Sequence, residues 1–191
     1  KVYHAHQIRG YIECRAKSAV VESLLPHQVL LVADWKQKWM LAVFRESMAE
    51  YFGKAGIPWH GVMYMMKHLP DSKGKVDANH ISVEYEDDIM LNDKKEDGFA
   101  VLKGFENSLR DFRARHPERN EAFLYTDGAG CYSGKFLCAA LPTASQSSGL
   151  YVISHCTGEA GKCKSELDGH FATTGQHCNR MIARDDNHAC T

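Results

Sequence analysis

Two short apolar runs that each end at an aspartate place the strongest constraint on the fold of this chain. Residues 29–33 (VLLVA) lead into Asp34, and residues 122–126 (AFLYT) lead into Asp127. Runs that are apolar at successive positions are typical of strands covered on both faces. Open α/β sheets bind their ligands at the carboxyl ends of such strands. The sequence therefore predicts an α/β fold in which Asp34 and Asp127 face a binding crevice.

Bringing the two aspartates together has a chemical consequence. Two carboxylates held close repel each other, and this repulsion raises a pKa unless a cation lies between them. Carboxylate oxygens are hard ligands that favour Mg2+ or Mn2+ over zinc. For either residue taken singly, the alternative is that the aspartate ends a strand as a turn former.

A third acidic position opens a later helix. The letters SELD at residues 165–168 predict a helix start, with Ser165 as the N-cap and Asp168 at the capping-box position. Glu166 and Asp168 also suit the positive end of the helix dipole, so each has a structural explanation besides metal binding.

Short motifs along the chain resemble the RNase H-like superfamily of DDE/DDD transposases and retroviral-type integrases. The resemblance is closest to transposon-derived domains of eukaryotic genomes. The motifs are DWK from residue 34, FGK from 52, WHG from 59, TDGAG from 126, GEAGK from 158 and DGHF from 168. With the strand that leads into the first motif, they span residues 29–171. The resemblance implies an α/β fold with an RNase H-like mixed five-stranded sheet flanked by helices.

The same resemblance implies a Mg2+-dependent (or Mn2+-dependent) DNA nuclease and strand-transfer enzyme, as in transposition and DNA recombination. Asp34, Asp127 and Asp168 would be the catalytic carboxylates and would hold two metal ions. Glu166 competes for the third place, because integrases usually have glutamate there, and Glu159 is a weaker candidate.

The expected DNA contacts depend on lysines, and the expected oligomeric state follows from the resemblance. Lys36 and Lys162 are expected to contact phosphates of bound DNA. Transposase-like enzymes usually work as multimers, so the resemblance also implies a homo-oligomer. The net charge of −1 gives no overall signature of nucleic-acid binding, and affinity for phosphate would therefore depend on local lysines.

Periodicity predicts the other elements. Strands are expected at residues 39–44, 59–66, 81–85 and 150–154, with a polar turn at 70–75 and a connection across 46–56. Residues 97–116 predict a helix because apolar side chains recur at steps of three and four. These side chains are Phe99, Leu102, Phe105, Leu109 and Phe112. Residues 1–24 predict an N-terminal connector helix, followed by the catalytic domain at 25–191.

Length and composition suit one domain. A chain of 191 residues with 44% hydrophobic residues can bury a sizeable core. The sequence contains no signal peptide and no apolar run of about eighteen residues, so we expect no membrane association. We expect an intracellular protein, nuclear if the chain is eukaryotic.

Cysteine and histidine are frequent, with seven and eleven residues. The odd cysteine count favours a reducing compartment. Six of these side chains crowd the C-terminal third: Cys156, Cys163, His177, Cys178, His188 and Cys190. Their spacings fit no standard zinc finger and include no CxxC pair, so a structural zinc is not expected.

Two alternatives to a working enzyme stay open. One is a domesticated, catalytically inactive transposase-derived domain that binds nucleic acid or protein. The other is a zinc-supported interaction module. Stabilisation by Mn2+ distinguishes a metal-binding carboxylate centre from both.

Overall fold

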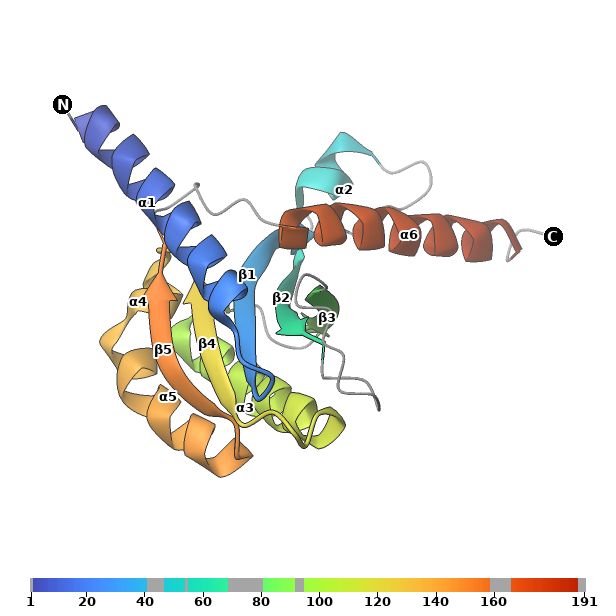
Figure 1. Cartoon of the computed structure of the whole chain (residues 1–191). Coiled ribbons are helices and arrows are strands. Elements are labelled where there is room, and N and C mark those ends of the chain that lie inside the picture. Colours follow the sequence, from blue (N-terminus) through green and yellow to red (C-terminus); the bar gives the residue numbers. More distant parts are fainter. Residues whose placement is uncertain are drawn as a thin grey trace.

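The computed structural model describes residues 2–40, 47–53, 55–68, 81–91, 95–158 and 166–188 (Figure 1). In chain order the elements are α1 (Val2–Ser23), β1 (Gln28–Trp39), α2 (Met48–Gly53), β2 (Ile57–Lys67), β3 (Ile81–Ile89), α3 (Gly98–Arg115), β4 (Glu121–Thr126), α4 (Gly130–Ser133), α5 (Lys135–Ser148), β5 (Tyr151–Thr157) and α6 (Glu166–His188).

The strands form one mixed five-stranded sheet in the order β3-β2-β1-β4-β5. β2 lies antiparallel between β1 and β3, whereas β4 runs parallel to both β1 and β5. β1 lies at the centre because its residues are apolar on both faces: Val29 and Leu31 enter one buried cluster, and Leu30 and Val32 enter the other. The predicted α/β class with a mixed sheet flanked by helices is confirmed.

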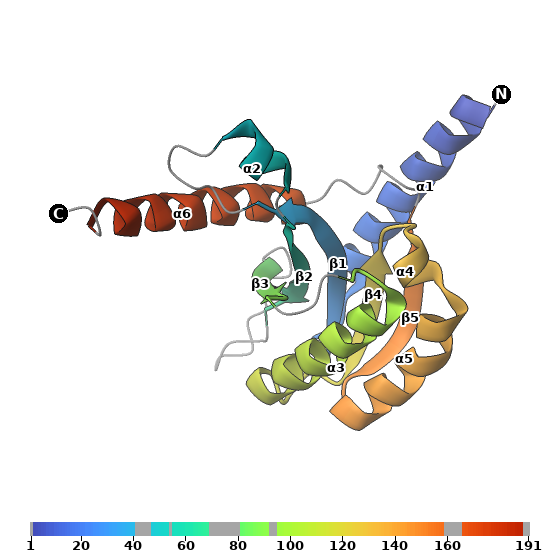
Figure 2. The same ribbon diagram turned by 180° about the vertical axis from the view of Figure 1, so that it is seen from behind.

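Helices cover the two faces of the sheet in separate layers (Figures 1 and 2). α3, α4 and α5 bury their apolar side chains against one face, in the larger cluster. α1 and α6 cover the other face. The buried residues of this layer are Val21 of α1, Leu24 directly after its end, and Leu167 and Phe171 of α6. In Figure 2 the layer with α3 and α5 lies in front of the sheet.

The helix predicted at residues 97–116 is confirmed as α3. Asp97 is its N-cap, because its carboxylate accepts hydrogen bonds from the backbone N–H groups of Phe99 and Ala100, both at 3.0 Å. Four members of the predicted apolar stripe are buried. The prediction is wrong for the fifth, Phe99, which is 57% exposed at the start of the helix.

Strands β2, β3 and β5 confirm three of the strand predictions, although β3 and β5 extend to Ile89 and Thr157. The separate strand predicted at 39–44 is not seen in the described part: Trp39 instead ends β1, and residues 41–46 lie outside the described residues. The turn at 70–75 also lies outside them.

A short helix, α2, forms where the sequence predicted only a connection. Its start is stabilised by a reciprocal pair of side-chain contacts. The Ser47 hydroxyl accepts a hydrogen bond from the Glu50 N–H at 3.3 Å, and the Glu50 carboxylate accepts one from the Ser47 N–H at 2.8 Å.

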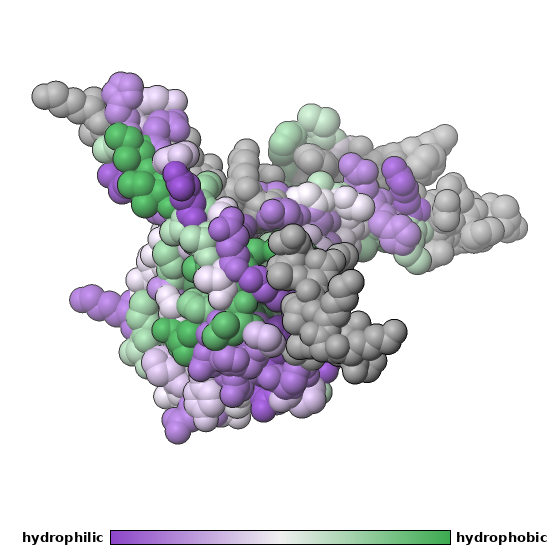
Figure 3. All heavy atoms as spheres, viewed as in Figure 1, coloured by the Kyte–Doolittle hydropathy of each residue, from purple (hydrophilic) through white to green (hydrophobic). Residues whose placement is uncertain are grey.

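Two helices, α1 and α6, extend beyond the sheet (Figure 1). The projecting half of α1 exposes hydrophobic side chains, among them Ile8 and Ile12 (Figure 3). No helix in the described part of the chain is both long and apolar enough to cross a membrane.

Candidate functional site

Parallel pairing of β1 and β4 brings Asp34 and Asp127 side by side. The register between these strands ends with Ala33 opposite Thr126, so the next residues are Asp34, within β1, and Asp127, directly after β4. Neighbouring strands lie about 4.8 Å apart, which makes the aspartates close neighbours despite their distance in sequence. On its other side Asp34 is opposite Gly61 of β2.

Backbone N–H groups hold both carboxylates. The Trp35 N–H donates to Asp34 Oδ1 at 2.8 Å, and the Ala129 N–H donates to Asp127 Oδ1 at 2.8 Å. The second contact is formed by the DGAG turn after β4, which bends back toward its own aspartate. These bonds restrict the rotation of each carboxylate. Asp127 directly follows the end of β4, as predicted, but Asp34 lies within β1, which continues to Trp39 because it stays paired with β2, so the prediction that a strand ends at Asp34 is wrong.

The electrostatics of Asp34 link all three predicted acids. Burial, together with the negative charge of Asp127, raises the pKa of Asp34 to about 7, while the hydrogen bond from Trp35 lowers it. Asp168 also raises this pKa by its charge. A carboxyl group in this state is stabilised by any bound cation. Asp34, Asp127 and Asp168 therefore share one region of negative potential.

α6 supplies the third acid. Leu167 and Phe171 are buried against the sheet, whereas Asp168 lies on an exposed side of the same first turns. Glu166, the competing candidate, is 59% exposed and pairs with Lys17 of α1 at 3.4 Å. A backbone hydrogen bond, with help from Lys17, lowers the pKa of Glu166. Of the two candidates, Asp168 is the one whose charge acts on Asp34.

Lys36 occupies a packing position. Its ammonium group lies 4.0 Å from the centre of the Trp59 ring and beside Gly175 of α6. Burial lowers the pKa of Lys36. Lys162 and Glu159 lie outside the described residues.

The donor chemistry of the three aspartates fits Mg2+ or Mn2+, since all their ligand atoms are carboxylate oxygens. Within the described ranges, no group of three His, Cys, Asp or Glu side chains is arranged as a metal site. Among the candidates for zinc, Cys156 and Cys178 are free thiols, and Cys163 and Cys190 lie outside the described residues.

A buried histidine, His60 of β2, lies on the face of the sheet that α3 covers. The ring of His60 packs against Trp35, Phe105 and Tyr132 at centroid distances of 4.9, 5.6 and 6.0 Å. Neither of its ring nitrogens has a hydrogen-bond partner among the described residues. Burial lowers the pKa of His60 to about 4, so the imidazole is neutral at pH 7.

Neutral burial of His60 predicts a loss of stability in acid. Because the folded-state pKa lies below the unfolded value of about 6.5, its contribution is present above pH 6.5 and is lost as the pH falls toward 4. Relative to His60→Leu, the native protein should lose about 2 kcal/mol of unfolding free energy when the pH falls from 7 to 5. Urea unfolding at both pH values measures it, and a constant difference would contradict the assignment.

Sequence reasoning missed Asp87 of β3 and His170 of α6. The two side chains meet, with His170 Nε2 at 2.7 Å from Asp87 Oδ2. His170 stands inside the DGHF motif and could have been noticed there. Asp87 gave no signal, since a polar residue in an alternating strand has an ordinary explanation on a solvent-facing side.

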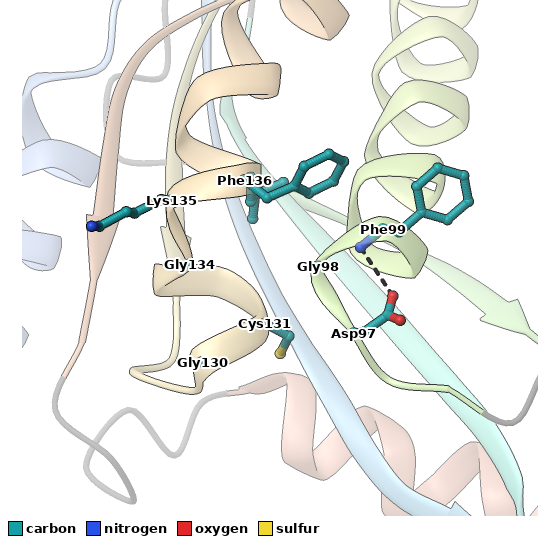
Figure 4. Close-up of a pocket in the computed structure, with 9 residues that line it drawn as sticks. Asp97, Gly98, Phe99, Gly130, Cys131, Gly134, Lys135 and Phe136 are labelled. Atoms are coloured by element: carbon teal, nitrogen blue, oxygen red, sulfur yellow. Dashed lines mark hydrogen bonds between the residues drawn. The ribbon is translucent and has the colours of Figure 1, made fainter.

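A shallow pocket of about 400 Å³ lies between the starts of α3 and α5, on the face of the sheet opposite α6 (Figure 4). Gly98, Gly130 and Gly134 contribute backbone to its wall, and Phe99 and Phe136 lie at a ring distance of 6.4 Å. Lys135 points away from the pocket, and the Asp97 carboxylate is engaged in capping α3 (Figure 4).

Comparisons of the chain with protein-family models, with curated proteins and with solved structures found no match.

Proposed function

We propose that this chain is an RNase H-like, metal-dependent nuclease and strand-transfer domain of the transposase and integrase type, with DNA as its substrate. The observation that carries the proposal is the pair Asp34 and Asp127, which lie side by side where β4 ends next to the parallel strand β1, with the pKa of Asp34 raised to about 7. Perturbed carboxyl groups in such a position are typical of functional sites.

The topology supports the same proposal. Three antiparallel strands are followed by two parallel ones in the order β3-β2-β1-β4-β5, and a helix after the fifth strand carries Asp168. A mixed five-stranded sheet flanked by helices is what the superfamily resemblance implies. Asp34 lies on β1, Asp127 directly follows β4, and Asp168 lies on α6.

Each acid has a defined part in the proposed chemistry. Asp34 and Asp127 are fixed ligands, because a backbone N–H holds one oxygen of each. Asp168 completes the negative site from α6. Bound Mg2+ would supply a Lewis acid that lowers the pKa of the attacking water or 3′-hydroxyl and stabilises the leaving oxygen. The chain's own contribution is to hold Asp34 beside Asp127, with Asp168 near enough for its charge to act on Asp34.

Metal binding and DNA nicking test the proposal together. The native protein should bind Mn2+, measured by the loss of the free-ion EPR signal, and should nick supercoiled plasmid DNA with Mg2+ but not with EDTA. Asp127→Asn should lower the nicking rate on the order of 10³-fold, since it removes a ligand of the Lewis acid.

Asp111→Asn is the matched control, because Asp111 is an exposed aspartate of α3, on the face of the sheet opposite α6, and lies 3.6 Å from its neighbour Arg110. It should nick DNA as the native protein does. Native protein that binds Mn2+ but does not nick would favour the inactive, transposase-derived binding domain. Native protein that binds no Mn2+ would overturn the proposal.

A further inference from the structure

One carboxylate connects α6 to the two outer strands of the antiparallel half of the sheet. Asp87 Oδ1 accepts a hydrogen bond from Trp59 Nε1 of β2 at 2.8 Å. Asp87 Oδ2 lies 2.7 Å from His170 Nε2 of α6. Both oxygens of a side chain on β3 are thus engaged, one with a neighbouring strand and one with the helix that carries Asp168.

The His170 ring is fixed on several sides. Tyr85 stacks on it at a centroid distance of 4.1 Å with an interplanar angle of 3°. Its Nδ1 lies 3.5 Å from the Thr174 hydroxyl, one turn further along α6. A ring with one face stacked and both nitrogens close to polar partners has little freedom to change its rotamer.

Apolar packing alone does not fix the rotation of α6 about its own axis. Leu167 and Phe171 bury the start of the helix against the sheet, and Phe171 meets Trp59 edge-on at 5.9 Å. Hydrophobic contacts are non-directional, so they fix how close the helix lies more firmly than how it is rotated. A hydrogen bond from a helix side chain to a fixed carboxylate depends on direction and therefore restrains rotation.

Rotation of α6 matters for the third acid. Asp168 precedes His170 by two residues, which is about 3 Å along the helix axis. Any turn of the helix about that axis swings Asp168 relative to Asp34, whose pKa its charge raises. The contact that fixes His170 therefore also fixes the direction in which Asp168 projects.

We propose that Asp87 and His170 are a positioning pair that fixes the rotation of α6 and so aims Asp168 at Asp34 and Asp127. This inference rests on the proposed function, because Asp168 needs aiming only if the three acids bind a common cation. Neither residue of the pair touches the cation or the substrate. Their effect passes through the backbone of α6.

Three substitutions separate this role from general stabilisation. His170→Phe keeps a ring for Tyr85 to stack on but removes the hydrogen bond to Asp87. His170→Gln retains a side-chain N–H donor near the position of Nε2 and serves as the rescue variant. Trp39→Phe is the matched control, because it removes another hydrogen bond of α6, from Trp39 Nε1 to Asn179 Oδ1 at 2.9 Å, far along the helix from Asp168.

Two measurements are made on each variant of the full chain. Hydrogen exchange of residues 166–174 without metal reports on the start of α6, and EPR titration reports Mn2+ affinity. We expect faster exchange and at least about 10-fold weaker Mn2+ binding for His170→Phe, as for other residues that support metal ligands. His170→Gln should be close to native, and Trp39→Phe should leave Mn2+ affinity unchanged.

Each outcome decides the matter. Native Mn2+ affinity in His170→Phe would overturn the positioning role, as would an equal loss in Trp39→Phe. If His170→Phe proves too unstable to purify, Asp87→Asn, which keeps the shape of the side chain but removes its charge, should weaken Mn2+ binding in the same direction. If the native protein itself binds no Mn2+, the proposed function fails and the positioning role fails with it. Faster exchange in His170→Phe would then assign the pair to stability of the fold alone.

Discussion

Replacing Asp34 with asparagine is expected to make the metal-free protein more stable while it abolishes Mg2+-dependent nicking. The folded-state pKa of Asp34 is about 7, against an ordinary value of 3.8 for aspartate. A raised pKa means that the contribution of this group to stability is present below pH 4 and is lost as the pH rises through 7. At pH 8 the ionised Asp34 therefore destabilises the fold, and asparagine removes that cost.

The expected gain is about 2 kcal/mol at pH 8, after a reduction for solvent screening of this partly exposed group. For a domain of this size, that corresponds to a rise in Tm of about 4–8 °C. At pH 4 the two proteins should be nearly equal in stability. Thermal unfolding with EDTA at both pH values measures the effect. Asp111→Asn should show a smaller pH dependence, because the charge of Asp111 is only one of several causes that raise the pKa of Asp88.

Adding Mn2+ should reverse the order of stability at pH 8. A cation that binds the native protein stabilises it by RT ln(1 + c/Kd), where c is the concentration of free Mn2+, whereas Asp34→Asn has lost a ligand and gains less. A variant that is less stable than the native protein at pH 8 without metal would contradict the proposed strain among the three acids. The result therefore bears on the site without requiring the correct DNA substrate.

Local pattern was enough to predict the part of the site that lies on strands. Residues 29–33 and 122–126 are apolar at successive positions, and only a central, covered sheet position satisfies such runs. Once both strands are central and parallel, their register places Asp34 and Asp127 side by side. The prediction needed no knowledge of side-chain packing.

The part of the site on α6 depends on contacts between distant residues, which local pattern does not contain. The sequence left Asp168 and Glu166 in competition because both suit the first turn of a helix. Lys17, from a helix at the other end of the chain, pairs with Glu166 and directs it toward α1. Likewise, Lys36 follows Asp34 by two positions, and only the packing of Trp59 and α6 shows that its ammonium group is engaged.

Substituting Gly61 with alanine should test how closely α6 must approach the sheet. A Cβ at this position would lie 2.5 Å from two ring atoms of Phe171 and 3.2 Å from Leu167. Both side chains are buried, so the ring cannot simply swing into solvent. Alanine usually suits a strand better than glycine, yet here α6 must lift or Phe171 must leave its place.

We expect Gly61→Ala to lose about 3 kcal/mol of stability in urea unfolding. Mn2+ binding should also weaken, since Gly61 lies directly opposite Asp34 and a displaced α6 carries Asp168 away. Gly169→Ala is the matched control: on the same helix, next to Asp168, an added Cβ meets nothing within 4 Å. That change should stabilise the protein by about 0.5–1 kcal/mol, because alanine is the better helix former. Equal effects of the two substitutions would mean that contact between α6 and β2 does not set the position of the third acid.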